Sequence, residues 1–278
     1  MSHFTEKNTL LHKPFITMIQ SSQILITGGT GLLGKAVCQI LDGKSVPYQI
    51  ATHQMQAPGD SVFMDLRTGE GMDQAVRNKK VILHLASDKK HPDYDVSGTI
   101  RLIDSIQKQG LSIHLIYISI VGVEELPMPY FKQKAQVEQI IVQSGLPYSI
   151  LKATQFHEYV DNALSSFFRF GVGLLPKNIL VQPVSVPVVA DMMVDLCFGN
   201  PTYQIQSIGG PEVLTIEDIV TQWQQARQQS KKYISFSLWG KAGRKLKRGV
   251  LTCPKNKKAG ENWSSWLQDN YSGKVWKD

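Results

Sequence analysis

The sequence predicts an α/β fold in which a doubly wound parallel sheet carries a small C-terminal substrate lobe. Short apolar segments alternate with helical patterns as far as about residue 155 of the 278-residue chain, and a glycine-rich turn follows the first apolar segment. Alternation of this kind places parallel strands side by side through right-handed crossovers. A ligand of such a sheet binds beyond the carboxyl ends of the strands.

The strands expected in this half are short and rich in Val, Ile and Leu, which is typical of strands buried on both faces. They cover residues 23–28, 46–52, 61–65, 80–86, 112–119 and 147–152. The helical patterns between them cover residues 31–42, 70–78, 93–109 and 131–144. Gly110 and Gly145 follow two of these helices, where glycine commonly ends a helix.

The pattern becomes less regular after about residue 155, where prolines divide the chain into short pieces. Helices are expected at 157–169, 188–197, 215–229 and 261–269. We therefore divide the chain into an N-terminal extension (1–22), a dinucleotide-binding core (23–156) and a smaller substrate lobe (157–278). The lobe is expected to be interleaved with the last strands of the sheet.

Composition is that of a globular enzyme, with 42% hydrophobic and 19% charged residues. No apolar run approaches the ~20 residues that cross a bilayer, and the first 22 residues do not resemble a secretory signal. The three cysteines are far apart and have no metal-ligand spacing. We therefore expect a cytoplasmic protein with structural thiols and no metal site, either a monomer or a homodimer.

Positive charge is concentrated in one segment of the chain. Residues 231–258, called the basic segment below, contain ten Lys or Arg and no Asp or Glu, within a net charge of +7. The segment is either a solvated helix face beside an acidic cofactor site or a surface for nucleic acid, anionic lipid or an acidic partner. Nothing else in the sequence gives a strong nucleic-acid signal.

The glycine turn predicts a diphosphate site. Gly28, Gly31 and Gly34 follow an apolar strand at three-residue spacing and open a helix. Side chains at Gly28 or Gly31 would block a diphosphate, whereas Gly34 is expected to let the helix pack close to the strand. The unpaired N–H groups at the helix start would bind the phosphates.

The residues after the second strand bear on the choice of dinucleotide. NAD-binding folds carry a carboxylate there, whereas this chain has Thr52 and His53. These two residues either bind a 2′-phosphate or form a surface turn, so we expect NADP, with NAD as the alternative. Asp65, after the third strand, either accepts a hydrogen bond from adenine or caps a turn.

Tyr130 and Lys134 are the expected catalytic pair. They stand four residues apart in a helix that begins near two prolines, so they share one face. A neighbouring lysine is expected to lower the pKa of the phenol, which then acts as a general acid or base. Tyr148 and Lys152 have the same spacing but lie in a strand, where ~3.3 Å per residue separates them by about 13 Å.

Other polar residues follow strands near the same edge. Ser119 either orients a substrate oxygen or caps a loop, and the Thr154–His157 stretch either contacts nicotinamide or substrate or is a plain loop. His84 is expected to be a hydrogen-bonded core histidine.

Taken together, four segments resemble the atypical short-chain dehydrogenase/reductases, specifically the NmrA-like NAD(P)-binding proteins. They are Thr27–Gly34, His84–Ser87, Tyr117–Gly122 followed by Tyr130 and Lys134, and Gly145–Phe156. The resemblance implies a Rossmann-type fold, dinucleotide binding at the glycine turn, and Tyr130 and Lys134 as the reductase pair with Ser119 beside them.

These observations lead us to expect an NAD(P)-dependent oxidoreductase acting on a small carbonyl, quinone or related molecule. The alternatives are a non-catalytic NAD(P)-sensing regulator and an enzyme like the sugar-nucleotide epimerases and dehydratases. Substrate contacts are expected at Val121, Gly122 and His157. The expected cofactor contacts are Gly28, Thr30, Gly31, Leu32, Leu33, Gly34, Thr52, His53, Asp65, Leu66, Leu85, Ala86, Ser87, Thr154, Gln155 and Phe156.

Overall fold

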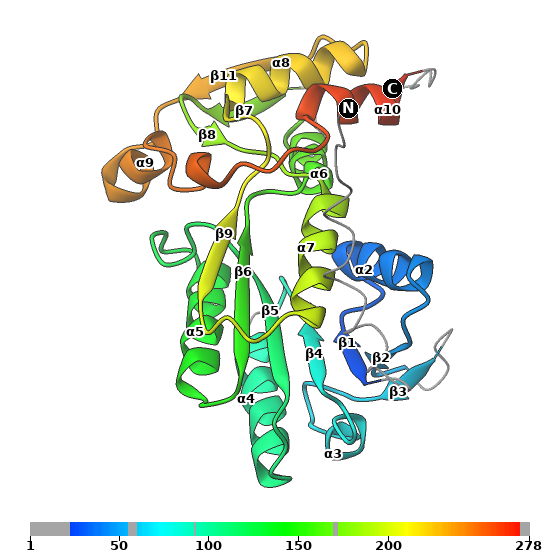
Figure 1. The fold of residues 1–278 in the computed structure, drawn as a ribbon. Helices are drawn as coiled ribbons and strands as arrows, with labels where there is room; N and C mark the ends of the chain where they lie inside the picture. Colours follow the sequence, from blue (N-terminus) through cyan, green and yellow to red (C-terminus); the bar gives the residue numbers. More distant parts are fainter. Residues whose placement is uncertain (1–22, 55–59, 92, 169–171, 273–278) are drawn as a thin grey trace, which may run out of the picture.

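The computed structural model describes residues 23–54, 60–91, 93–168 and 172–272 (Figure 1). The N-terminal extension predicted at residues 1–22 lies outside the described residues. The chain forms a Rossmann-like α/β core with a C-terminal lobe above one end of its sheet. The predicted fold class is confirmed.

A seven-stranded parallel sheet forms the core, in the order β3-β2-β1-β4-β5-β6-β9. The first six strands correspond to the six expected from the sequence: β1 (Ile24–Thr27), β2 (Tyr48–Thr52), β3 (Ser61–Phe63), β4 (Val81–His84), β5 (His114–Ile120) and β6 (Tyr148–Ala153). The seventh, β9 (Ile205–Ile208), was not predicted and comes from the C-terminal half. The strand order reverses between β1 and β4, which places the ligand crevice at their carboxyl ends.

Helices cover both faces of this sheet. On one face α2 (Leu32–Gly43) packs against α7 (Val186–Phe198), and the predicted structural thiols Cys38 and Cys197 are buried there. On the other face lie α3 (Met72–Ala75), α4 (Asp93–Lys108) and α5 (Pro129–Gln143). Helix α2 buries Val37 and Leu41, four residues apart, because that spacing gives a helix one apolar face.

The C-terminal lobe has its own core. Helices α6 (His157–Phe167), α8 (Ile216–Ala226) and α10 (Trp263–Tyr271) surround buried Phe168, Trp223 and Trp263. Two small sheets complete it: β7 (Val172–Pro176) runs parallel to β11 (Lys232–Phe236), and β8 (Leu180–Val181) runs antiparallel to β10 (Leu214–Thr215). Helix α9 (Gly240–Lys247) and a short 3-10 turn (Pro254–Asn256) lie within the basic segment. The helices of the lobe were predicted, except for α9, and its strands were not.

Hydrogen bonds of the Gln155 side chain hold this lobe to the core. It donates to the Leu251 carbonyl (2.9 Å) and accepts from the Gln182 N–H (3.2 Å). Within the lobe, the buried Gln182 side chain accepts from the Cys253 N–H (2.5 Å) and donates to the Gly210 carbonyl (2.7 Å). In the described part of the chain, no helix combines the length and apolar character needed to cross a membrane.

Candidate cofactor and substrate site

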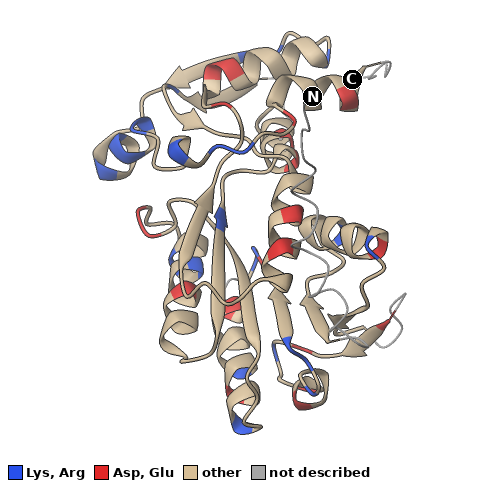
Figure 2. Cartoon of the chain, in the orientation of Figure 1, with Lys and Arg blue, Asp and Glu red and all other residues tan. Residues whose placement is uncertain are grey.

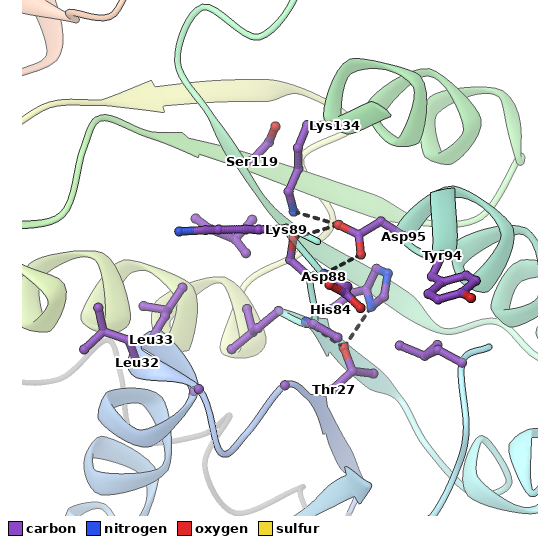
Figure 3. Close-up of a pocket in the computed structure, with 18 of the residues that line it drawn as sticks. Thr27, Leu32, Leu33, His84, Asp88, Lys89, Tyr94, Asp95, Ser119 and Lys134 are labelled. Atoms are coloured by element: carbon purple, nitrogen blue, oxygen red, sulfur yellow. Dashed lines mark hydrogen bonds and ion pairs between the residues drawn. The ribbon is translucent and has the colours of Figure 1, made fainter. Parts of the chain in front are cut away.

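A cavity of about 730 Å³ lies at the carboxyl ends of the strands, where the sheet order reverses. Every residue predicted to bind the cofactor lines it, as do Ser119, Tyr130 and Lys134. Figure 3 shows Leu32 and Leu33 on one side of the cavity and Ser119 and Lys134 on another. The size falls within the ~300–1,000 Å³ range of cofactor and small-molecule sites.

The three glycines of the turn have different structural roles. Gly28 has φ +70°, and a Cβ there would lie 2.7 Å from the Ala86 backbone nitrogen. A Cβ on Gly34 would lie 2.2 Å from the Gly28 carbonyl oxygen. Gly28 therefore fits the turn against the end of β4, and Gly34 lets the start of α2 pack against the backbone of the turn. The role of Gly28 in admitting a diphosphate stays a prediction.

Gly31 is the glycine that opens space toward a ligand. It has φ −74° at the N-cap of α2, and only the Gly28 carbonyl, at 3.2 Å, lies close to a Cβ placed on it. No side chain caps the helix, and its first turn contains no acidic residue. The first N–H groups of α2 therefore present an unneutralised positive end to the cavity.

The polar residues after β2 and β3 line one part of the cavity. The Thr52 hydroxyl accepts a hydrogen bond from the Gln54 N–H (3.1 Å), so Thr52 shapes the turn and keeps its own proton for a further acceptor. Asp65 accepts from the Arg67 N–H (2.7 Å) and forms an ion pair with the Arg67 guanidinium (3.3 Å). Burial tends to raise the pKa of Asp65, but Arg67 lowers it overall.

His84 is a buried structural residue, as predicted. Its Nδ1 lies 2.8 Å from the Thr27 hydroxyl, and its Nε2 lies 2.9 Å from the Thr99 hydroxyl. Burial lowers the pKa of His84 to about 3. The neutral ring therefore joins β1, β4 and α4 beneath the cavity without carrying charge.

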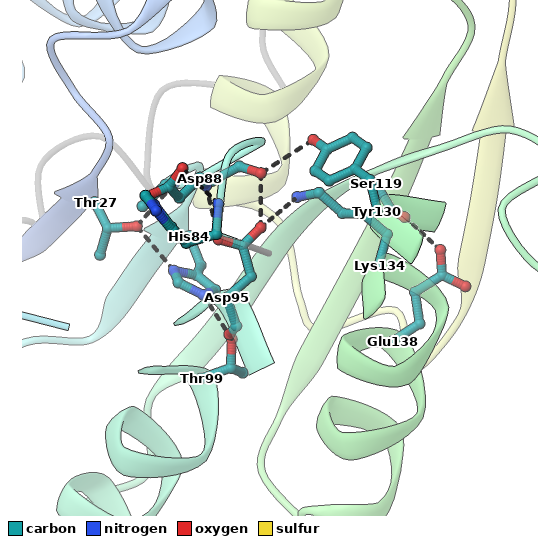
Figure 4. Close-up of polar contacts among 12 residues, drawn as sticks. Thr27, His84, Asp88, Asp95, Thr99, Ser119, Tyr130, Lys134 and Glu138 are labelled. Carbon is teal, nitrogen blue, oxygen red and sulfur yellow. Dashed lines mark hydrogen bonds and ion pairs between the residues drawn. The ribbon is translucent and has the colours of Figure 1, made fainter. Parts of the chain in front are cut away.

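The Tyr130 hydroxyl lies 3.0 Å from the Ser87 hydroxyl, which donates to the Asp95 carboxylate at 2.7 Å (Figure 4). Ser87 has a single hydroxyl proton, and Asp95 takes it, so Tyr130 is the donor in the first of these bonds. The result is a directed chain from Tyr130 through Ser87 to Asp95. Asp95 also accepts from the Asp88 N–H (2.8 Å), which holds the loop after β4 in place.

Lys134 lies one helical turn beyond Tyr130 and is almost completely buried. Its ammonium is 3.9 Å from Asp95 and 4.8 Å from the centre of the Tyr117 ring. Burial lowers the pKa of Lys134 to about 8, although the charge of Asp95 opposes this shift. At neutral pH the amine is therefore mostly protonated inside the cavity.

The pKa of Tyr130 differs from the prediction. Burial and the nearby Asp95 charge raise it to about 12, while the Ser87 hydrogen bond acts in the opposite direction. Lys134 does not depress this pKa because its ammonium lies 5.9 Å from the centre of the Tyr130 ring and beside the Asp95 carboxylate. Tyr130 is thus a protonated phenol, suited to donate a proton rather than to accept one.

Ser119 lines the cavity, but its hydroxyl is engaged elsewhere. It donates to buried Glu138, which also accepts from Lys152 (3.1 Å). Lys152, which is buried, also forms an ion pair with the exposed Glu124 (2.7 Å), so the lysine of the second Tyr-x-x-x-Lys motif belongs to a separate network. The polar partner of Tyr130 is Ser87 rather than Ser119.

The Thr154 and Lys89 side chains face other parts of the cavity. The Thr154 hydroxyl is buried and has no hydrogen-bond partner among the described residues. The Lys89 ammonium lies 3.5 Å from the centre of the Tyr159 ring, and both residues line the cavity with Leu251 of the lobe. These groups leave an unused hydroxyl, a cation and an aromatic face available to ligands.

Val121, Gly122 and His157, predicted as substrate contacts, do not line the cavity. Val121 is buried, and Gly122, with φ +83°, lies against the Val250 carbonyl, which a Cβ would approach to 2.4 Å. The His157 ring is fully buried beside Trp263 and Trp266. The lobe residue Val250 thus covers Gly122, and His157 lies inside the lobe core. These contacts are long-range, so the sequence alone did not indicate them.

Other cavity residues were not predicted as site residues, among them Arg67, Asp88, Lys89, Tyr94, Asp95, Tyr159 and Leu251. Asp95 had a weak local signal, since acidic side chains are common in the first turn of a helix. The hydrogen bond from Ser87 to Asp95 joins the loop after β4 to helix α4, and no sequence pattern indicated it.

A family comparison identifies the chain. The model of the NmrA-like family matches residues 20–234, most of the sequence. The chain belongs to the NmrA-like family. Among curated proteins, this NmrA-like protein is 24% identical over 152 residues to the photosystem II assembly factor Ycf39 of Trieres chinensis. That match covers 49% of this chain and 46% of the relative, about half the length of each.

Solved structures share the fold of this NmrA-like protein. A nucleoside-diphosphate-sugar epimerase from Staphylococcus aureus superposes with a TM-score of 0.73 at 15% identity, over 88% of this chain and 99% of its own. An NADPH-dependent quinone oxidoreductase from Escherichia coli gives 0.70 at 13%, over 90% and 100%. The UDP-glucose 4-epimerase of Thermus thermophilus, solved with NAD, gives 0.67 at 17%, over 90% and 99%.

Proposed function

We propose that this NmrA-like protein is an NAD(P)-dependent oxidoreductase that reduces a small carbonyl or quinone substrate. The observation that carries the proposal is the chain of Tyr130, Ser87 and Asp95, with Lys134 beside it. These residues line the same cavity as the uncapped start of α2. A protonated phenol and a phosphate-binding helix end in one cavity are what a reductase requires.

The residues of the cavity fit a nicotinamide dinucleotide. The first turn of α2 would hold the diphosphate, because its positive end is neither capped nor neutralised by the protein. The buried Thr154 hydroxyl, which has no partner among the described residues, would bind a polar group near the other end. When bound, the nicotinamide would supply the hydride.

The chain's own residues would manage the proton. The Tyr130 hydroxyl would donate its proton to the substrate oxygen as that oxygen gains negative charge. Ser87 accepts from Tyr130 in the resting structure, and its hydroxyl would turn to donate to the phenolate that remains. The Lys134 ammonium would stabilise the same negative charge electrostatically and bind a ribose hydroxyl.

NADP is the cofactor that we favour over NAD. No carboxylate stands at Thr52, His53 or Gln54 after β2 to repel a 2′-phosphate. Arg67 brings a guanidinium to the same cavity, and Asp65, the nearby carboxylate, is already paired with it. The fold shared with an NADPH-dependent quinone oxidoreductase is compatible with this choice.

Cofactor choice is tested by comparing dissociation constants for NADPH and NADH. We expect NADPH to bind at least about tenfold more tightly, and Arg67→Ser to remove most of that difference, because a guanidinium–phosphate pair is a strong, charge-assisted contact. NADH binding should change little. Tighter binding of NADH by the unaltered chain would contradict the assignment.

The function is tested with Tyr130→Phe. Turnover of NADPH with a panel of quinones and carbonyl compounds should fall by about 10²–10⁴-fold, while the NADPH dissociation constant stays within about twofold. Tyr94→Phe is the matched control, because Tyr94 lines the same cavity and is not part of the proposed proton path. Full turnover by Tyr130→Phe would refute the role of Tyr130. Binding without turnover of any panel member by the unaltered chain would favour the regulatory alternative.

A further inference from the structure

The C-terminal lobe carries an apolar sheet face that no described element covers. In the parallel pair β7–β11, Leu174 is in register with Ile234, and Pro176 with Phe236, so each pair shares a face. Leu174 is 58% exposed and Ile234 61% exposed, and Val172 and Phe236 on the same face are also exposed. The opposite face packs inward, where a Cβ on Gly173 would lie 2.6 Å from the Phe168 ring.

An exposed tryptophan extends this apolar face. Trp239 follows β11 by three residues and is 89% exposed. We define the lobe face as Val172, Leu174, Ile234, Phe236 and Trp239. Contiguous exposed apolar side chains of this kind mark a site of association with a membrane or another protein.

A cationic helix adjoins the lobe face. Helix α9 begins directly after Trp239, and blue Lys and Arg segments alternate with tan ones along it in Figure 2. Lys241, Arg244 and Arg248 are exposed at spacings of three and four, which places them on one side of the helix. Lys245 points elsewhere, since it forms an ion pair with Glu125 (2.5 Å). Leu246 packs into the lobe core.

Cations also flank the small sheet itself. Lys232 is in register with Val172 on the exposed face, and exposed Lys177 follows β7 directly. The acidic residues at the start of α8 are engaged by the backbone: Glu217 accepts from the Asn178 N–H (3.0 Å) and Asp218 from the Thr215 N–H (3.2 Å). Five exposed cations, Lys177, Lys232, Lys241, Arg244 and Arg248, therefore border the lobe face, against these two acidic residues.

We propose that the lobe face and helix α9 together form a peripheral binding surface for an anionic lipid bilayer. The aliphatic side chains and Trp239 would enter the interface between headgroups and acyl chains, and the cations would lie against acidic headgroups. Charge complementarity selects this occupant. Lysine is depleted at protein–protein interfaces, and aliphatic residues such as Leu174 and Ile234 add nothing to phosphate contacts with nucleic acid.

Vesicle sedimentation of the full chain tests the proposal. The chain should sediment with vesicles of phosphatidylcholine containing 30% phosphatidylglycerol, remain in solution with pure phosphatidylcholine, and dissociate in high salt. A Lys241→Glu and Arg244→Glu double variant should bind at least tenfold more weakly. The matched control, Arg77→Glu with Lys80→Glu, makes the same charge change at exposed positions near α3 and should bind normally.

The apolar contribution has its own pair of variants. Ile234→Ser with Trp239→Ser should weaken binding at least tenfold, whereas Ile100→Ser with Val142→Ser, at exposed positions on α4 and α5, should not. Quenching of tryptophan fluorescence by brominated lipid should fall in Trp239→Phe. Thermal unfolding of each variant checks that it is folded, and the exposure of these side chains predicts unchanged midpoints.

Three outcomes would overturn the proposal. The first is failure of the unaltered chain to bind anionic vesicles at low salt. The second is equal binding by the lobe-face variants and their controls. The third is a dimer by light scattering that becomes a monomer in Ile234→Ser with Trp239→Ser, since the lobe face would then be a contact between two copies of this chain.

Discussion

The hydroxyls of Tyr130 and Ser87 lie 3.0 Å apart, and the proton between them belongs to Tyr130. This relationship joins helix α5 to the loop after β4 across the cavity, and it makes Ser87 the immediate partner of the proposed proton donor.

Ser87→Ala should lower turnover by about 10-fold or more, with little change in NADPH affinity, because the Tyr130 phenolate would lose its hydrogen-bond donor. Ser119→Ala is the matched comparison. It should leave turnover nearly unchanged and reduce the free energy of unfolding by about 1–2 kcal/mol, since Glu138 loses a buried partner. Steady-state kinetics and urea unfolding separate the two. The reverse pattern would make Ser119 the catalytic serine.

Asp95→Asn should shift the alkaline side of the kcat/KM profile to lower pH. The charge of Asp95 raises the pKa of Lys134 against the effect of burial, so without that charge the pKa of Lys134 falls below its present value of about 8. The ammonium is then lost closer to neutral pH. Asp93→Asn makes the same change on the same helix turn, outside the cavity, and should leave the profile in place. An unmoved profile in Asp95→Asn would remove Lys134 from the mechanism.

Gly31→Ala should weaken NADPH binding at least about tenfold while the chain remains folded. The φ of −74° suits alanine, and the nearest atom to the new Cβ, the Gly28 carbonyl oxygen, is 3.2 Å away. Gly34→Ala should instead prevent stable folding, because its Cβ would lie 2.2 Å from that same oxygen. Calorimetry and thermal unfolding measure the two effects. Normal NADPH binding by Gly31→Ala would place the diphosphate elsewhere.

Buried His157 should make the protein sensitive to acid. Burial beside Trp263 and Trp266 lowers the pKa of His157 to about 4, although the Pro183 backbone opposes this. Between pH 6.5 and 4 the unfolded chain therefore binds more protons at this residue, so stability is lost as pH falls through that window, by up to about 1.4 kcal/mol per pH unit.

His157→Leu removes this titration and should flatten the dependence of the unfolding free energy on pH between 6 and 4.5. Above pH 7, His157 is neutral in both states, so the two proteins should show parallel curves there. Urea unfolding at several pH values provides the measurement. Identical slopes below pH 6 would show that His157 does not control acid stability.

Local sequence signals were sufficient to predict the glycine turn and the Tyr130–Lys134 pair. Both depend on spacing within one strand–turn–helix unit or one helix. There, the hydrophobic periodicity and the turn residues determine which residues lie close together. The contacts of Ser87 with Asp95 and of Ser119 with Glu138 join separate elements, so no local pattern predicted them. The pKa of Tyr130 was predicted incorrectly because it depends on burial and on Asp95, and neither follows from the spacing of Tyr130 and Lys134.

The lobe shows the same limit. Its helices other than α9 carry apolar periodicity and were predicted, whereas β7 and β11 pair across more than fifty residues of intervening chain. The basic segment was evident from composition. The exposed apolar side chains beside it come together on one surface only because β7 pairs with β11, and the sequence did not predict that pairing.

The position of β9 has a consequence for biosynthesis. The sheet receives its seventh strand only when residue 208 has left the ribosome, after α7 and most of the lobe's first half. Until then the outer edge of β6 carries unpaired N–H and C=O groups that any extended chain can join. A nascent chain that stalls before residue 205 therefore has a nearly complete Rossmann-like core with an open, aggregation-prone edge, and chaperone protection matters most during that interval.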